Sequence, residues 1–301
     1  MWEVLAIVGG AALVLVALRD IFDTLFHPHG RGIVSERLIR AIWRVTRRVA
    51  GANHRVLSFA GPVSFFAVIL AWSTLVILGF AVMLWPHFPN DYVVAEGAGR
   101  DGGIGDALYL SMVNLTSLGY GDIVPAATGL RYLGPLETLI GLGLLTASIS
   151  WILILYRVLS DSRTLSDEIA LLSETEREAD VRLSQMAPQA AAATLSDITS
   201  RLITVRDDLA HSPIAYYFHP RQRRHAIPAV LPGLIEVVDD CSEAETPAEL
   251  RFQAEMLRRA ISRLLETVNT EFLRAPACGS AEILAAYQGD HGWSAERTPD
   301  T

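Results

Sequence analysis

The chain has 301 residues, of which 51% are hydrophobic, and its formal net charge is -8. This composition is too apolar for an ordinary soluble domain, and the apolar excess lies in the first half of the chain. The negative net charge argues against nucleic acid as a binding partner.

Three apolar segments are long enough to cross a bilayer as helices, which takes about 20 residues. Segment 1–18 holds one charged residue, Glu3, segment 63–85 holds none, and segment 133–156 holds Glu137. We expect an N-terminal transmembrane helix within 1–26 and two further spans at 62–85 and 131–156. A cleaved signal peptide is the alternative for the first segment, but its positive charges follow the apolar run rather than precede it.

Arginine is the only basic residue besides histidine, and its distribution predicts the orientation of the chain. Segment 19–55 carries eight arginines against three acidic residues, whereas the loop 86–106 is acidic. Because cytoplasmic segments carry the excess of positive charge, we expect the N-terminus outside and the C-terminus in the cytoplasm. The expected location is the inner or plasma membrane of the cell, as a multi-pass protein.

Segment 31–55 has the pattern of a basic amphipathic helix. Ile33, Val34, Leu38, Ile42, Val45 and Val49 fall on one side, and arginines fall on the other. Such helices lie on membrane surfaces, so we expect the helix to be interfacial and to contact lipid, anionic lipid included. The lipid-facing basic residues would be Arg40, Arg44, Arg47 and Arg48. A solvated linker helix whose charges only set the topology is the alternative.

The loop between the second and third spans contains a short polar stretch, TSLGYGDIVP, from Thr116 to Pro125. An apolar stripe before it predicts a helix at 106–116, with Asp106 as its N-cap. Irregular backbone at membrane depth persists only where it is buried in protein or lines a water-filled path. Gly119 and Gly121 allow φ to alternate in sign, which turns successive carbonyl oxygens to one side. A ring of such oxygens can replace the water shell of a cation.

The stretch TSLGYGD resembles the filter signature TVGYGD of the potassium channel superfamily, within a resemblance that covers about residues 62–156. The resemblance implies a filter at 117–122 that binds K+ ions through backbone carbonyls, with no organic cofactor. The K+ ligands would be the carbonyls of Ser117, Leu118, Gly119 and Tyr120 and the Ser117 hydroxyl, and Thr116, Gly121 and Asp122 would support the filter.

Two features of the sequence depart from this family pattern. Ser117 and Leu118 replace the usual threonine and valine. Val113 lies where some members carry a glutamate that pairs with the filter aspartate, so the sequence does not say how Asp122 is held.

The inner helix and the surface helix are similar to those of prokaryotic inward-rectifier-like channels. In the potassium channel family, a glycine at the offset of Gly141 from Gly119 often bends the inner helix, so the resemblance implies that Gly141 is a gating hinge. A small residue that lets helices approach closely is an equal alternative. Glu137 lies four residues earlier. We expect it to support the filter by bracing the pore helix, rather than to line the cavity and attract cations.

Residues 159–288 predict a helical cytoplasmic domain, and residues 289–301 predict a disordered tail. Apolar residues recur at steps of three and four in two stripes, Leu195, Ile198, Leu202, Val205 and Leu209, and Leu250, Leu257, Ile261, Leu264 and Val268. These stripes predict the core of a helical bundle, with a coiled coil as the alternative.

The sequence thus predicts an all-α membrane protein with a two-helix-plus-re-entrant-pore-loop channel domain at 61–158. An extra N-terminal transmembrane helix precedes this domain, and a helical cytoplasmic domain follows it.

The predicted function is a homotetrameric, potassium-selective channel, because four copies complete each ring of oxygens. The alternatives are a weakly selective cation channel and a non-conducting, membrane-anchored sensor or scaffold. No enzyme activity is predicted, since the sequence has no dinucleotide fingerprint, Walker loop or nucleophile elbow. The cytoplasmic ligand or partner is unknown from the sequence.

Overall fold

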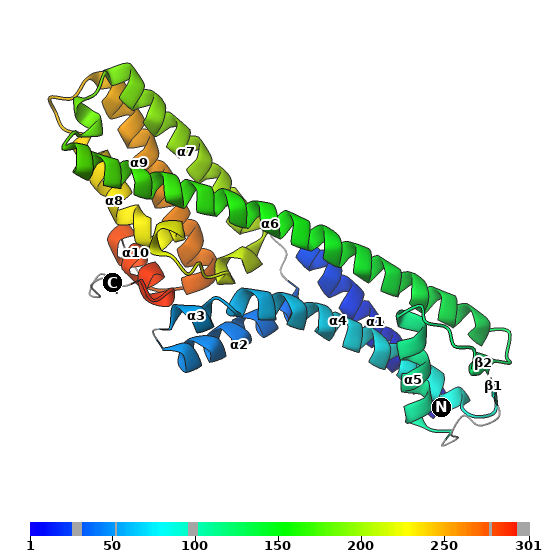
Figure 1. Ribbon diagram of the computed structural model, residues 1–301. Coiled ribbons are helices and arrows are strands. Elements are labelled where there is room, and N and C mark those ends of the chain that lie inside the picture. Colours follow the sequence, from blue (N-terminus) through cyan, green and yellow to red (C-terminus); the bar gives the residue numbers. More distant parts are fainter. Residues whose placement is uncertain (26–31, 52, 96–101, 277–278, 294–301) are drawn as a thin grey trace. The chain divides into compact units, whose positions relative to one another are not determined.

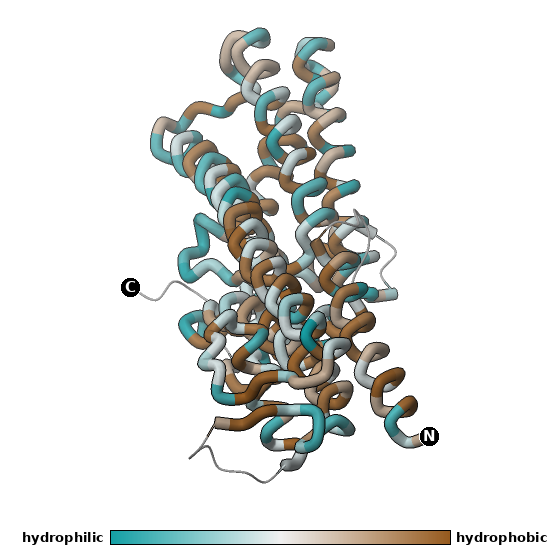
Figure 2. The backbone as a smooth tube through the Cα atoms, turned by 90° about the vertical axis from the view of Figure 1, so that its right-hand side faces the viewer, coloured by the Kyte–Doolittle hydropathy of each residue, from teal (hydrophilic) through white to brown (hydrophobic). Residues whose placement is uncertain are grey.

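The computed structural model describes residues 1–25, 32–51, 53–95, 102–276 and 279–293. The chain divides into two compact units, 1–41 with 63–154 and 42–62 with 155–301. Within the described residues, three helical stretches are long and apolar enough to cross a membrane, at Trp2–Leu25, His54–His87 and Leu130–Ala179. Brown, hydrophobic turns dominate the helix that rises from the N label in Figure 2. The predicted class, an all-α membrane protein with a helical C-terminal region, is confirmed.

In the first unit, α1 (Trp2–Leu25) packs against α4 (Ala60–Leu84) through two glycines. A Cβ atom on Gly10 would lie 2.3 Å from the carbonyl oxygen of Gly79, so the two backbones touch. Small residues at such a crossing are what lets membrane helices approach closely. Val14, Val76 and Phe80 extend the buried contact beside the crossing.

The helix α2 (Ile33–Ala50) begins at a carboxylate that belongs to α1. Asp20 Oδ1 accepts the backbone N–H of Val34 at 2.8 Å, and Oδ2 accepts that of Ser35 at 3.1 Å. The indole N–H of Trp72, on α4, donates to the same Oδ2 at 2.8 Å. A carboxylate at a helix N-terminus satisfies free amides and complements the helix dipole, so Asp20 fixes the start of α2.

The helix α2 ends at Ala50, before the predicted boundary at residue 55. Gly51 has a φ of +54°, a left-handed conformation that ends the helix. A separate short helix, α3 (His54–Leu57), follows, with the Asn53 side chain accepting the N–H of Arg55 as its cap.

The segment between α4 and α6 contains a two-stranded antiparallel sheet that the sequence did not predict. The strand β1 (Tyr92–Val94) pairs with β2 (Ile123–Pro125), and Val93 lies opposite Val124. One further bond, from the N–H of Ala95 to the carbonyl oxygen of Asp122 at 2.8 Å, extends this pairing. The sheet therefore holds the outer end of the predicted filter.

The pore helix of the prediction is α5 (Ile104–Leu115), which begins two residues before the expected boundary at 106. Gly103, not Asp106, is the N-cap residue. Asp106 lies in the first turn and accepts the N–H of Gly102 at 2.9 Å. The prediction of Asp106 as N-cap is wrong, because its carboxylate reaches back to an amide that precedes the helix.

The helix α6 (Leu133–Ala179) is a single element of 47 residues that extends far past the predicted boundary at 156. It follows a short 3-10 turn, η2 (Leu130–Tyr132), and Figure 1 shows it as one continuous ribbon. No glycine or proline occurs between Leu144 and Ala179 to stop the helix. Leu165 and Ile169 are buried in the second unit, so packing stabilises the extension.

The second unit is a helical bundle built from the later half of α6 with α7 (Pro188–His211), α8 (Ile227–Asp240) and α9 (Ala248–Val268). The bundle is completed by α10 (Ser280–Asp290) and by the short turns η3 (Leu183–Gln185), η4 (Pro213–Tyr217), η5 (Arg223–His225) and η6 (Asn269–Leu273). The helices α7 and α9 lie side by side (Figure 1), and both predicted stripes are buried within one chain. The stripes are therefore core stripes of the bundle.

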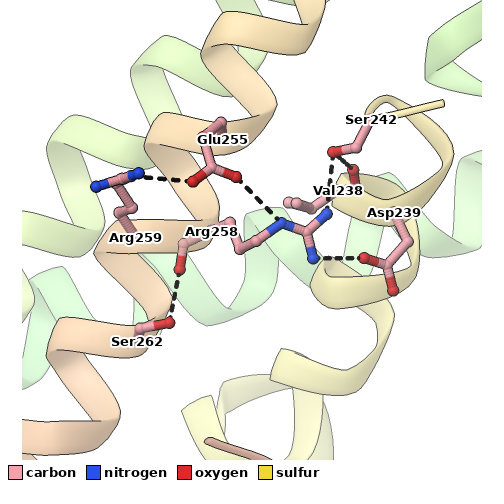
Figure 3. Close-up of polar contacts among 7 residues, drawn as sticks. All are labelled: Val238, Asp239, Ser242, Glu255, Arg258, Arg259 and Ser262. Carbon is pink, nitrogen blue, oxygen red and sulfur yellow. Dashed lines mark hydrogen bonds and ion pairs between the residues drawn. The ribbon is translucent and has the colours of Figure 1, made fainter. Parts of the chain in front are cut away.

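A network of polar contacts links α9 to the end of α8 (Figure 3). Arg258 donates to Asp239 Oδ1 at 2.7 Å and to the Ser242 hydroxyl at 3.0 Å. Its Nε atom also lies 3.5 Å from Glu255, which accepts a second bond from Arg259 at 2.9 Å. Each exposed ion pair of this kind contributes little to the free energy of folding. Together these contacts fix the register of α9 on α8.

Residues 289–293 are ordered, which corrects the predicted start of the disordered tail at 289. The Asp290 carboxylate accepts bonds from the Trp43 indole at 3.1 Å, from the Tyr216 hydroxyl at 2.6 Å and from Arg47. Trp293 stacks on His54 with ring centroids 4.2 Å apart. These contacts hold the end of α10 in place. The remainder of the predicted tail, 294–301, lies outside the described residues.

Two histidines are buried beside this aromatic cluster. His219 shares a 2.8 Å hydrogen bond with His54, and its ring lies 5.8 Å from that of His291. Burial, with His291 and His54 nearby, lowers the pKa of His219 to about 3. Burial, with Arg47 nearby, lowers the pKa of His291 to about 3. Both rings are therefore neutral at ordinary pH.

Candidate functional site

The backbone of the predicted filter alternates in conformation from one residue to the next. Ser117, Gly119 and Gly121 have φ values of +59°, +57° and +75°, while Leu118 and Tyr120 keep the negative φ of ordinary residues. This alternation turns successive carbonyl oxygens to one side, as the two glycines lead one to expect. The positive φ of Ser117 was not expected from the sequence, because the left-handed conformation costs a residue with a side chain about 1–2 kcal/mol.

The inner end of the filter is tied to the last turn of α5. The Thr116 hydroxyl donates to the carbonyl oxygen of Met112 at 2.7 Å. The N–H groups of Ser117 and Leu118 donate to the carbonyl oxygens of Asn114 and Val113, each at 3.0 Å. The pore helix therefore leads directly into the alternating backbone without a flexible joint.

Asp122 is held by a tyrosine instead of by a glutamate. The Tyr109 hydroxyl, on α5, donates to Asp122 Oδ2 at 2.7 Å. This bond links the Asp122 end of the filter to the pore helix. The Val113 side chain cannot make such a link, because it has no polar atom. Sequence analysis missed Tyr109, because a tyrosine 13 residues before the aspartate carries no signal until the helix and the filter are packed together.

We expect Tyr109→Phe to loosen the outer end of the filter while leaving the fold intact. A hydrogen bond to a carboxylate contributes about 1.5–3 kcal/mol, and the phenylalanine ring preserves the packing. The expected result is a current that decays faster during sustained recording in planar bilayers. Tyr132→Phe is the matched control, because the Tyr132 side chain is exposed. Equal decay for Tyr109→Phe and the parent chain would contradict this role.

Glu137 is completely buried on α6 and faces the pore helix. Its Oε2 accepts the side-chain amide of Asn114 at 3.2 Å, and its Oε1 accepts the Ser111 hydroxyl. The same hydroxyl lies 3.0 Å from the carbonyl oxygen of Ile77, so one proton serves two acceptors. If Glu137 carried a proton, its carboxyl could donate to the Ser111 hydroxyl while that hydroxyl donates to the carbonyl oxygen of Ile77. Each of these three groups would then have a hydrogen-bond partner.

Ser111 and Asn114 are further site residues that the sequence analysis did not name. They are polar side chains three residues apart, on one face of a helix expected at membrane depth. That spacing is a readable signal, because a buried polar pair in such a helix requires a partner. With Glu137, the pair forms the brace between α5 and α6.

Gly141 lies against the end of the pore helix. A Cβ atom at this position would be 2.1 Å from the carbonyl oxygen of Leu115. One turn earlier, the Thr138 hydroxyl donates to the carbonyl oxygen of Asn114 at 2.8 Å. The helix α6 continues through Gly141 without a break. These contacts favour the packing alternative for Gly141, and its role as a gating hinge stays a prediction.

The four predicted lipid-facing arginines have different surroundings. Arg40 pairs with Glu36 at 3.0 Å. Arg47 pairs with Asp290 and donates to the carbonyl oxygen of Gly289 at 3.3 Å, and its contact with lipid stays a prediction. Arg44 and Arg48 are exposed. The buried side of α2 carries Ile39 and Trp43, while Val45 and Val49 are exposed beside the arginines.

Comparison with known proteins points to the same segment. Residues 65–157 match the model of a family described as "Ion channel". Over 282 residues the chain is 22% identical to the "Uncharacterized membrane protein YdjJ" of Bacillus subtilis (strain 168), covering 89% of this chain and 79% of that protein. No solved structure matches the chain. The family match, on the segment that holds α5, the filter and the membrane part of α6, indicates that residues 65–157 are the pore domain of an ion channel.

Proposed function

We propose that four copies of this chain form a potassium-selective channel. In it, the carbonyl oxygens of Ser117, Leu118, Gly119 and Tyr120 replace the hydration shell of K+, and the Ser117 hydroxyl adds a ligand at the inner end. The observation that carries the proposal is the alternation of φ at 117, 119 and 121. One chain supplies one oxygen at each level, so symmetric copies are needed to close the rings.

The exposure of the filter side chains in a single chain supports the assembly. Leu118 is 54% exposed and Tyr120 is 66% exposed. Both flank irregular backbone, which lipid could not satisfy with hydrogen bonds. Contact with neighbouring subunits would cover these side chains, and the free carbonyls would then face a shared axis.

The surrounding residues have supporting parts in this proposal. Thr116, Gly121, Asp122 and Glu137 hold the filter in place. The N-terminus lies outside and the C-terminus lies in the cytoplasm, as the arginine distribution predicts. Exposed Arg44 and Arg48, with Val45 and Val49 beside them, would place that face of α2 on the inner membrane surface, where anionic lipid binds.

A flux measurement on the purified chain in liposomes tests the function. With K+ and Na+ gradients of opposite direction, we expect the current to reverse near the K+ equilibrium potential. Reversal midway between the two equilibrium potentials would indicate the weakly selective cation channel instead. The absence of any flux, with a stable assembly by crosslinking, would indicate a non-conducting sensor or scaffold.

A further inference from the structure

The second unit contains an open groove that the channel function does not use. It has a volume of about 680 Å³ and lies between the later half of α6 and the segment formed by η5 and α8. Four charged side chains line it, Arg177 and Glu174 from α6 and Arg223 and Arg224 from η5. The lining thus carries three guanidinium groups and one carboxylate, in a chain whose net charge is negative.

The guanidinium groups retain hydrogen-bond donors. Arg177 donates through Nε to the carbonyl oxygen of Ser173 on its own helix at 3.0 Å, which leaves its terminal amino groups available. The Arg223 side chain forms no hydrogen bond or ion pair with any residue in the described part of the chain, although its backbone carbonyl accepts the N–H of Ala226 at 3.0 Å. Arg224 donates to Gln222 at 3.2 Å and lies 3.4 Å from Asp167, so it is the most compensated of the three.

The part of the groove between α6 and α8, called its floor here, is lined by small and apolar residues. Ala170, Val230 and Gly233 form part of it, and a Cβ atom on Gly233 would lie 2.7 Å from the Ser173 hydroxyl oxygen. The helices α6 and α8 therefore approach closely at the floor. The volume lies in the range of small-molecule sites, which combine an apolar surface with a few polar groups.

We propose that this groove binds a phosphate monoester. The phosphate group would lie between Arg177 and Arg223, because the planar guanidinium fork matches phosphate oxygens in a bidentate manner and stays charged at any relevant pH. The apolar part of the ligand would rest on Ala170 and Val230. A soluble organic phosphate and a lipid phosphate headgroup share this chemistry.

If the proposed function holds, ligand binding in this groove could affect the pore through α6. Arg177 lies on α6, the same continuous helix that carries Glu137 and Gly141. A phosphate shared by Arg177 and Arg223 would tie the end of that helix to η5. Control of conduction rests on the proposed function, whereas binding of the phosphate does not.

Calorimetric titration of the full chain in detergent micelles tests the site. The probes are adenosine monophosphate, adenosine, inorganic phosphate and a short-chain phosphatidic acid. We expect saturable binding of adenosine monophosphate, weaker binding of inorganic phosphate and none of adenosine. The double variant Arg177→Gln/Arg223→Gln should bind about tenfold more weakly or worse, since two charge-assisted contacts are lost. Arg263→Gln, which removes an exposed charge from α9, should bind like the parent chain.

A second variant separates the groove from general electrostatic attraction. Ala170→Phe fills the floor and keeps every arginine, so it should also abolish binding. Saturable binding of phosphatidic acid alone would assign the same site to a lipid headgroup. Absence of saturable binding for all phosphate probes, or unchanged binding in the double variant, would overturn the proposal. Phosphate binding by a chain that conducts no ions would leave the site standing and remove the channel function.

Discussion

Gly121→Ala is expected to abolish potassium current. Gly121 has a φ of +75°, and no other described side chain crowds the position in a single chain, so the penalty is backbone strain. A methyl group in the left-handed region costs about 1–2 kcal/mol per residue, and in the proposed tetramer this cost arises four times in one ring. A filter under that strain would relax to a conformation whose carbonyl oxygens no longer face the axis. Gly119→Ala should act in the same way, since its φ is +57°.

Ser117→Ala is the informative comparison for these glycine variants. Ser117 already carries a side chain at positive φ, so the change removes one hydroxyl and leaves the backbone as it was. We expect reduced current with unchanged reversal potential. Gly105→Ala, at an open position on α5 outside the filter, should conduct normally. Normal current in Gly121→Ala together with silence in Ser117→Ala would mean that side chains handle the ion, contrary to the carbonyl mechanism.

Gly141→Ala should destabilise the pore domain and suppress current for a different reason. The added methyl would lie 2.1 Å from the carbonyl oxygen of Leu115, one residue before Thr116 and the filter. Relief of this overlap requires α6 and α5 to separate, and overpacking of this kind costs about 1–3 kcal/mol in each subunit. The expected results are a lower thermal stability of the assembly in detergent and a loss of selective current.

Gly143→Ala is the matched control for this variant. It lies on the same helix two residues later, and no described atom lies within 4 Å of its added Cβ. Alanine there should stabilise the helix by up to about 1 kcal/mol. A hinge role for Gly141 would produce another pattern, with a lower open probability but unchanged thermal stability and selectivity. That pattern would contradict the packing explanation.

Those features of the pore that depend on local pattern could be predicted from the sequence. Apolar length predicts α1, α4 and the membrane part of α6, and two glycines around Tyr120 predict the alternating backbone. The boundary of α6 was misjudged at residue 156, because the change to polar composition looked like an end although nothing there breaks a helix. The sheet of β1 and β2 escaped prediction, since its three-residue strands pair across a helix and the filter.

Contacts between residues that are far apart in the sequence could not be predicted. The hydroxyl of Tyr109 reaches Asp122 only once α5 has a fixed rotation about its axis. Arg47 has the sequence surroundings of a lipid-facing residue, yet its partner Asp290 lies 243 residues further along the chain. No local periodicity contains that information, and an arginine can equally pair with a phosphate or with a carboxylate.

The neutral histidines of the second unit make the stability of that unit depend on the pH around it. The Nδ1 atom of buried His219 and the Nε2 atom of buried His291 have no partner in the described structure, so a proton added to either ring would be an uncompensated charge. Their pKa values fall from the usual 6.5 to about 3 on folding, so the unfolded chain takes up protons first. The stabilisation from neutral rings is complete above pH 6.5 and declines by about 1.4 kcal/mol per histidine for each pH unit below it. Acidification below pH 6.5 therefore weakens the unit in which Trp43 and His54 contact Asp290 and Trp293 at the end of α10.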